Sequence, residues 1–309
     1  MVVLALLVTG GVVLVRGGLG TSKEKRATEA AQRFMTAYAA GDASTLQGFF
    51  SDAVKAMRDL SLITDKVLTT STKQAPIGQV EIRKPREGNL DNYTVPVAFT
   101  LGSRTVSMEL GVTTYTSRPP TVNPGLVMLD LHGVKAMGAQ VNGAAPATDM
   151  PSVLPGSYHI TLPSPYLEVQ HDELVLPGGR GPARATLALS SEGKQAYRNA
   201  VLRSLRGCLE EKTIASGCGL KPEASLGHQP VEGTITRTMP PEDLARIQSI
   251  KVTDAVGRPG TVTNGAPLGT VTMEFQCAGQ SSEKTCTSQR QLREAKIDMT
   301  RPQLVVEWS

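Results

Sequence analysis

Aromatic residues are scarce in this 309-residue chain and make up only 4% of it. Hydrophobic residues still account for 40%, so the core must rest mainly on aliphatic side chains. Lysine and arginine form no long runs, and no aromatic residues alternate with them. Nucleic-acid-binding surfaces usually have these features, so we expect no nucleic-acid partner. The mild net charge of +4 suits a surface that faces anionic lipid or an anionic wall polymer.

Metal-binding and phosphate-binding motifs are also missing. The cysteines have no Cys-x-x-Cys arms or histidines at ligand spacing, so we expect no metal. No glycine-rich loop follows a strand and opens a helix, since proline and a further strand follow Gly178-Gly179-Arg180-Gly181. We therefore expect no bound cofactor.

The four cysteines lie in two close pairs, Cys208 with Cys218 and Cys277 with Cys286. Four cysteines allow three pairings, and local pairing is the simplest. In the chain-entropy model, closing a loop this short stabilises the fold by about 3 kcal/mol. Free thiols and a metal site are the alternatives. Disulfides persist in oxidising compartments, so this interpretation places the bulk of the chain outside the cytoplasm.

The first fifteen residues carry no charge. A helix of that length spans about 22 Å, whereas the hydrocarbon core of a bilayer is about 30 Å thick. We expect a transmembrane anchor over residues 1–20 that begins further upstream, with Arg16 at the interface. No basic region precedes the apolar run, which disfavours a cleaved signal. A buried core strand or helix is the alternative.

Residues 21–133 predict a small α+β domain in which helices precede strands. Apolar residues recur at helical spacing over 21–40, where Gly41 ends the first helix, and over 42–57, where Asp42 caps the second. A third helix is expected over 60–68.

Antiparallel strands complete this domain. Apolar and polar residues alternate over 93–101 and 106–112, a pattern typical of half-buried strands. Pro96 predicts an edge strand or a bulge. Residues 126–131 are expected to close a curved sheet.

Residues 27–43 read Ala-Thr-Glu-Ala-Ala-Gln-Arg-Phe-Met-Thr-Ala-Tyr-Ala-Ala-Gly-Asp-Ala. This pattern resembles the first helices of nuclear transport factor 2-like domains of bacterial envelope proteins, and the resemblance covers residues 24–132. It implies a cone-like domain. Such a cone can host isomerase chemistry that uses a tyrosine and a carboxyl group. Tyr38, Tyr93 and Tyr115 are the candidates here, and the alternative is that each fills the core.

Residues 134–309 predict a second α+β domain that contains both disulfides. Ser190 or Ser191 caps a helix whose inner face carries Tyr197, Val201 and Cys208. A short helix is expected over 240–247. Five strands are expected to form one meander and a second cone, and they cover 231–237, 250–256, 271–277, 286–298 and 304–308.

The pieces Val141-Asn142-Gly143 and Leu154-Pro155-Gly156-Ser157-Tyr158 resemble the extracellular modules of the teicoplanin-resistance-associated membrane protein family and its actinobacterial relatives. The pair Cys208-Leu209 and Gly217-Cys218 resembles the same proteins. That family places an aromatic residue and a proline after the second cysteine, where this chain has Gly219-Leu220. The family is held by one span behind a cytoplasmic zinc ribbon, which has no counterpart in this sequence.

Two patterns could indicate catalysis. Ser191 and Lys194 match the Ser-x-x-Lys motif of penicillin-interacting enzymes, as do Ser22 and Lys25. These enzymes also need a Lys-Thr-Gly strand, and the most similar stretch here, Lys284-Thr285-Cys286, has cysteine in place of the glycine. We therefore interpret Ser191 as part of a helix cap.

The second pattern is His171-Asp172-Glu173, the only place where one of the four histidines (132, 159, 171 and 228) stands beside carboxylates. Neighbouring strand residues point to opposite faces, so a solvated turn is favoured over a general base or metal ligand.

We therefore expect no catalytic residues, and a membrane-anchored, non-enzymatic envelope protein that binds another envelope protein, a wall component or a small ligand. The alternatives are a cone-domain isomerase or hydrolase, and a structural spacer that carries an upstream cytoplasmic module.

Overall fold

The computed structural model describes residues 4–8, 11–15, 22–115, 117–170, 173–177, 183–223, 229–254, 260–278 and 284–308. The expected α+β class is confirmed, because helices pack on largely antiparallel sheets. The chain forms two compact units. Unit 1 contains residues 1–163 and 169–186, and unit 2 contains 164–168 and 187–309. The chain thus passes between units after residues 163, 168 and 186, and the expected boundary after residue 133 lies inside unit 1.

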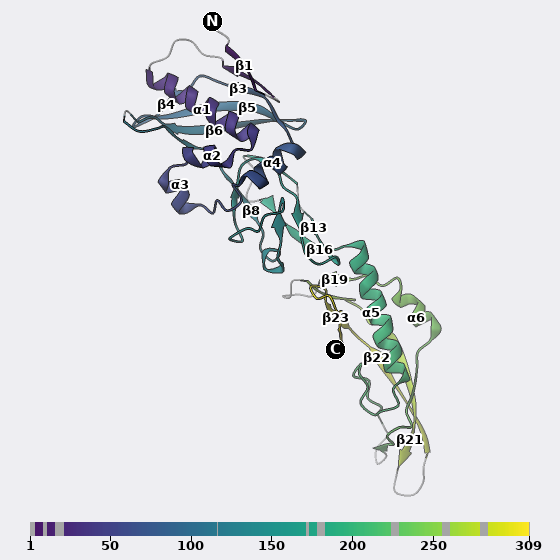
Figure 1. Ribbon diagram of the computed structural model, residues 1–309. Coiled ribbons are helices and arrows are strands. Elements are labelled where there is room, and N and C mark those ends of the chain that lie inside the picture. The colour runs from purple at the N-terminus through teal and green to yellow at the C-terminus, as the bar shows by residue number, and fades with distance from the viewer. Residues whose placement is uncertain are drawn as a thin grey trace. The chain divides into compact units, whose positions relative to one another are not determined.

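Helices α1 to α4 precede most strands of unit 1. Helix α1 (Ser22–Ala40) packs across strands of the main sheet (Figure 1). It ends at Gly41, whose φ of +71° favours glycine, and a Cβ there would lie 2.9 Å from the backbone nitrogen of Thr69. Asp42 caps α2 (Ala43–Phe49) by accepting from the Thr45 backbone N–H at 2.9 Å.

The expected helix over 42–57 is broken in two. Phe50 is extended and buried, and the Ser51 hydroxyl accepts from the Val54 N–H, so a new helix, α3 (Asp52–Met57), begins there. Helix α4 (Asp65–Gln74) starts later than expected because Thr64 caps it.

The main sheet of unit 1 has the order β1-β2-β3-β5-β6-β7, and β4 pairs with β5. The expected alternation of buried and exposed residues is confirmed in β5 and β6. The sheet's buried face packs on α1, with Phe99 and Leu110 among its core residues. Its later strands are β3 (Ile77–Ile82), β4 (Arg86–Glu87), β5 (Asn92–Leu101), β6 (Arg104–Thr113) and β7 (Thr121–Asn123).

Pro96 does not mark an edge, because β5 has β6 on one side and β3 and β4 on the other. The Pro96 carbonyl accepts from the Arg83 N–H at 3.0 Å. In an extended strand the N–H and C=O of one residue point the same way, so the missing donor of Pro96 faces the turn between β3 and β4. The ladder with β6 therefore loses no hydrogen bond.

The opening of the chain differs from the expected helix over 1–20. Its described parts are strands β1 (Leu4–Val8) and β2 (Gly11–Val15), and β2 runs parallel to β3 with Val13 beside Val80. Valine is β-branched and favours strands, and the Gly10-Gly11 pair disfavours a helix. Within the described residues, no helix has the length and apolar character needed to cross a membrane.

Short strands complete unit 1. Strand β8 (Val127–Asp130) does not close the main sheet as expected, because β7 does so. β8 instead lies between β10 (Ser152–Val153) and β15 (Ala183–Arg184). The other short elements of unit 1 are the 3-10 helix η1 (Lys135–Met137) and strands β9 (Gln140–Val141), β11 (Gly156–Ser157), β12 (Ile160–Thr161) and β14 (Leu174–Val175). Strands β13 (Leu167–Gln170) and β16 (Thr186–Leu189) each contain residues of both units.

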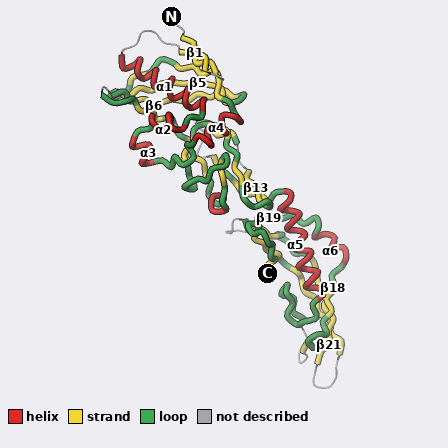
Figure 2. Tube along the Cα trace, in the orientation of Figure 1, coloured by secondary structure: helices red, strands yellow, loops and turns green. Residues whose placement is uncertain are grey.

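Unit 2 contains two helices, and its remaining described residues are strands and loops (Figure 2). Helix α5 (Ser191–Glu210) begins as expected, since the Ser190 hydroxyl accepts from the Gly193 N–H at 2.9 Å. Its buried face includes Tyr197, Val201 and Cys208. The short helix α6 (Pro241–Ile247) lies where it was expected.

The expected single meander is instead two sheets of four strands. In one, β17 (Gln229–Pro230) and β18 (Thr236–Thr238) pair with one side of β21 (Gly269–Ala278), and β22 (Lys284–Leu292) pairs with the other. The second sheet has the order β19-β20-β23-β24. Its strands are β19 (Thr253–Asp254), β20 (Thr261–Thr263), β23 (Ala295–Asp298) and β24 (Val306–Trp308).

Candidate functional site

The structure brings the expected cysteine partners together. Cys208 at the end of α5 is bonded to Cys218, with their Cα atoms 5.8 Å apart. Cys277 on β21 is bonded to Cys286 on β22, with a Cα separation of 6.0 Å. In the register of this hairpin, Cys286 lies opposite Phe275, so the second bridge joins diagonal neighbours. One bridge therefore closes the loop after a helix, and the other closes the end of a hairpin.

A buried arginine holds the loop closed by the first bridge. The guanidinium of Arg237 donates to the backbone carbonyls of Glu211, Thr213 and Leu220, the last two at 2.7 and 3.1 Å. Burial lowers the pKa of Arg237, and the nearby charges of Glu211 and Glu232 oppose this. The guanidinium therefore holds the backbone that follows α5 through charge-assisted hydrogen bonds.

The interior between α1 and the main sheet is the place where isomerase chemistry was expected. Tyr38 is buried between Phe34 and Phe99, with ring centroids 6.5 and 6.2 Å away. Its hydroxyl has no hydrogen-bond partner among the described residues, and burial raises its pKa well above the ordinary value. Tyr93 is also buried, whereas Tyr115 is 39% exposed. The three tyrosines thus occupy different environments.

No carboxylate accompanies Tyr38 among the buried polar residues described in unit 1. Those residues are Ser71, Thr114, Asn142, Ser152 and Ser157. The tyrosine and carboxyl pair of an isomerase is therefore not assembled by the described part of this interior.

Asn142 joins the two sequence pieces of the second resemblance. Its side chain accepts from the His159 N–H at 2.8 Å and donates to the Ser157 carbonyl at 3.0 Å. The same amide donates to the Val67 carbonyl of α4 at 3.3 Å. The Tyr158 hydroxyl donates to the Leu154 carbonyl at 2.6 Å. These buried polar groups connect backbone segments of unit 1 to each other.

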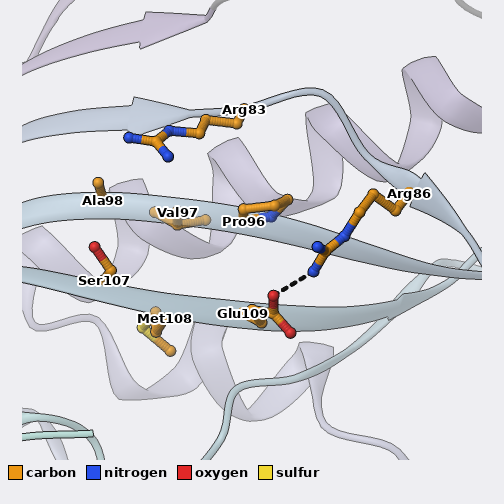
Figure 3. Close-up of a pocket in the computed structure, with 8 residues that line it drawn as sticks. All are labelled: Arg83, Arg86, Pro96, Val97, Ala98, Ser107, Met108 and Glu109. Atoms are coloured by element: carbon orange, nitrogen blue, oxygen red, sulfur yellow. Dashed lines mark hydrogen bonds and ion pairs between the residues drawn. The ribbon is translucent and has the colours of Figure 1, made fainter.

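An open trough lies on the other face of the main sheet (Figure 3). It has a volume of about 340 Å³, and Pro96, Ala98 and Ser107 are among its lining residues. The side chains of Arg86 and Glu109 pair across it and are 63% and 61% exposed. The trough carries both signs of charge at its rim.

Arg83 extends from the turn after β3 toward the same trough (Figure 3). Its Nε lies 3.6 Å from Glu81, and its side chain is 61% exposed. The guanidinium of Arg83 is therefore loosely paired, whereas that of Arg86 is bound by Glu109.

The two Ser-x-x-Lys pairs lie at the starts of two helices. Ser191 and Lys194 are exposed in the first turn of α5. Cys286, which ends the Lys-Thr-Cys stretch, is bonded to Cys277. Ser22 and Lys25 are exposed in the first turn of α1.

Two of the four histidines, His132 and His159, lie beside carboxylates. His171, Asp172, His228 and the loop 178–181 lie outside the described residues. Glu173 instead lies 3.3 Å from the ring of His159. The ring of His132 lies 2.7 Å from Asp130. Burial raises the pKa of Asp130, but hydrogen bonds from His132 outweigh this and lower it.

Sequence reasoning missed Arg237 and the rim of the trough. Arg237 lies in an alternating Thr-Arg-Thr strand, a pattern that does not distinguish a buried arginine from an exposed one. Arg86 and Glu109 are 23 residues apart, and only the pairing of β4, β5 and β6 brings them together.

Within the described residues, no group of three or more histidine, cysteine, aspartate or glutamate side chains could hold a metal ion. Comparison with protein-family models, with curated proteins and with solved structures found no match.

Proposed function

We propose that this chain is a non-enzymatic protein of the bacterial cell envelope, with both units outside the cytoplasm. The two disulfides are the observation that carries the proposal. All four cysteines are paired within local loops, and such bridges persist in oxidising compartments. We further propose that unit 1 is a nuclear transport factor 2-like cone. Helices α1 to α4 are followed by strands β3 to β7 of a sheet that packs on α1, and this arrangement supports the proposal.

The hydrogen bonds of the buried polar groups in unit 1 support a binding or structural role. The side chains of Asn142 and Tyr158 form hydrogen bonds with backbone groups of neighbouring loops and of α4. These hydrogen bonds hold the loops of unit 1, and the surface that the loops form, in one shape. The partner in this proposal is another envelope protein or a wall component.

The tether in this proposal is a single span formed by the uncharged opening segment, which must leave its place beside β3 to enter the membrane. Alkaline carbonate extraction of membranes tests it, and we expect the full chain to stay with the lipid. Release by carbonate contradicts the tether and agrees with pairing of β2 and β3 in solution.

Thiol counting tests the location. The protein is isolated from intact cells, alkylated without reductant, digested and examined by mass spectrometry. We expect no alkylated cysteine and two linked peptide pairs, 208 with 218 and 277 with 286. Four free thiols in native material contradict the outside location. Alkylation after reduction is the control for accessibility.

The buried hydroxyl of Tyr38 favours a second candidate, a cone-domain isomerase or hydrolase. An unpartnered buried hydroxyl costs free energy unless a ligand or water satisfies it. Tyr38→Phe separates the two proposals. A non-enzymatic protein should keep its envelope function and gain stability, whereas an enzyme that uses this hydroxyl should lose activity and keep its fold.

A further inference from the structure

One face of the first sheet of unit 2 carries almost only threonine and glutamine. We name it the Thr/Gln face. It consists of Thr236, Thr238, Thr270, Thr272, Glu274, Gln276, Thr285, Thr287, Gln289 and Gln291. Nine of these ten side chains are neutral, and Glu274 carries the single charge. The trough of unit 1, also on an open sheet face, is lined by two arginines and a glutamate. The Thr/Gln face therefore carries less charge than the trough.

Strand register arranges the face in rows. Thr236, Glu274 and Thr287 lie side by side, and the next row contains Thr238, Thr272 and Gln289. Neighbouring strands lie about 4.8 Å apart, and side chains on one face repeat about every 6.8 Å along a strand. The face is thus a regular array of hydroxyl and amide groups.

The array has a rigid support. The opposite side of β21 buries Val271, Met273, Phe275 and Cys277. The Cys277–Cys286 bridge ties β21 to β22. Threonine has a restricted χ1 angle because it is β-branched. Binding of a ligand to these threonines therefore costs little side-chain conformational entropy.

A hollow adjoins the end of the face. It has a volume of about 490 Å³ and is lined by Gly265, Ala266, Pro267, Gln291, Arg293 and Glu294. Gln291 belongs to both the face and the hollow. An extended ligand that lies along β22 can therefore continue into a recess that contains charged groups.

We propose that the Thr/Gln face and this hollow bind an uncharged glycan strand of the cell wall. Threonine hydroxyls and glutamine amides both donate and accept hydrogen bonds, as sugar hydroxyls do. Nine of the ten groups bring no charge that must be desolvated on binding. A polymer with a regular repeat can engage several rows at once, so weak single contacts accumulate. The proposal rests on the outside location proposed above.

Titration of the full chain in detergent with chitohexaose, a neutral and soluble glycan, tests the proposal by calorimetry. We expect saturable binding. The variant Thr285→Val, Thr287→Val, Gln289→Met keeps the volume and strand preference of three exposed residues on β22 and removes their hydrogen-bonding groups. It should bind at least tenfold more weakly. The matched control Thr94→Val, Thr100→Val, Thr105→Val changes the main sheet of unit 1 and should stay within twofold of the wild type.

No saturable binding by the wild type overturns the proposal, and so does equal weakening by the control variant. Sedimentation without glycan checks another occupant, a second copy of the chain seated on the face. The proposal is overturned if the wild type forms a dimer that the substitutions on β22 dissociate and that the glycan leaves intact. Thiol counting keeps the two proposals separate. Four oxidised cysteines without glycan binding contradict the glycan site alone, whereas free thiols contradict the outside location, on which the glycan site rests.

Discussion

Replacement of Arg237 by methionine should strongly destabilise unit 2. The wild-type guanidinium, only 4% exposed, donates to the carbonyls of Glu211, Thr213 and Leu220. A hydrogen bond to a charged group contributes about 1.5 kcal/mol at the low end. Three such bonds give roughly 4–5 kcal/mol, and water can replace the partners of the two carbonyls on the exposed loop. We expect a loss of about 3 kcal/mol in the free energy of unfolding.

The single tryptophan of the chain provides the assay. Trp308 lies on β24, and its indole N–H donates to the Ser204 hydroxyl of α5 at 3.0 Å. Its fluorescence therefore reports the unfolding of unit 2. With an m-value of about 2 kcal/mol/M in urea, a loss of ~3 kcal/mol lowers the midpoint by about 1.5 M.

Arg206→Met is the matched control, because Arg206 is exposed on α5 of the same unit. It should change the free energy of unfolding by less than about 0.5 kcal/mol. If Arg237→Met behaves like Arg206→Met, the guanidinium does not hold the loop, and the reasoning from its hydrogen bonds is refuted.

Three further predictions concern the disulfide on the hairpin, a crowded glycine and a partly exposed carboxylate. Cys277→Ser with Cys286→Ser should lower the free energy of unfolding of unit 2 by about 3 kcal/mol, the chain-entropy value for a loop this short, and urea unfolding followed by Trp308 measures it. An unchanged midpoint would contradict that bridge. Gly156→Ala should cost about 1–3 kcal/mol in thermal unfolding of unit 1, because the new Cβ would lie 2.4 Å from the Ser71 hydroxyl, whereas Gly48→Ala, with open space around it, should not destabilise. Equal melting temperatures for the two variants would exclude this clash. Burial raises the pKa of Asp59, but hydrogen bonds from Thr148 and Ser61 outweigh it and lower the pKa below its ordinary value. The carboxylate therefore stabilises unit 1 above about pH 4, and this stability is lost as the pH falls through the lowered pKa. Asp59→Asn should destabilise unit 1 at pH 7 and match the wild type near pH 2, and parallel unfolding curves across that range would show that Asp59 makes no such contribution.

Local signals in the sequence predicted much of the fold. Asp42 and Ser190 cap the helices they were expected to cap, because a side-chain oxygen that accepts from an N–H three residues on depends only on nearby sequence. The alternation in β5 and β6 was confirmed for a similar reason, since one face of each strand packs on the core. Ser51 carried the same capping signal, and it explains why the helix expected over 42–57 is two helices.

Features that depend on distant partners were not predictable. Pro96 suggested an edge strand. In the structure its missing N–H faces the turn between β3 and β4, so the hydrogen bonds between β5 and β6 are kept. The strand expected over 286–298 is two strands that belong to different sheets. Nothing in the local pattern distinguishes one long strand from two, or assigns each to its neighbours. The burial of Arg237 could not be predicted for the same reason, since its acceptors lie on a loop that precedes it by 17 to 26 residues.

The alternating membership of residues 164–186 limits how this protein can be taken apart or recombined. A fragment that ends at residue 163 lacks β14 and β15, which pair with β11 and β8 of the same unit. A fragment that begins at residue 187 lacks residues 164–168, where the Ser164 hydroxyl donates to the Met299 carbonyl. No single breakpoint in the gene separates the two units intact, so both must be inherited, expressed and exchanged together.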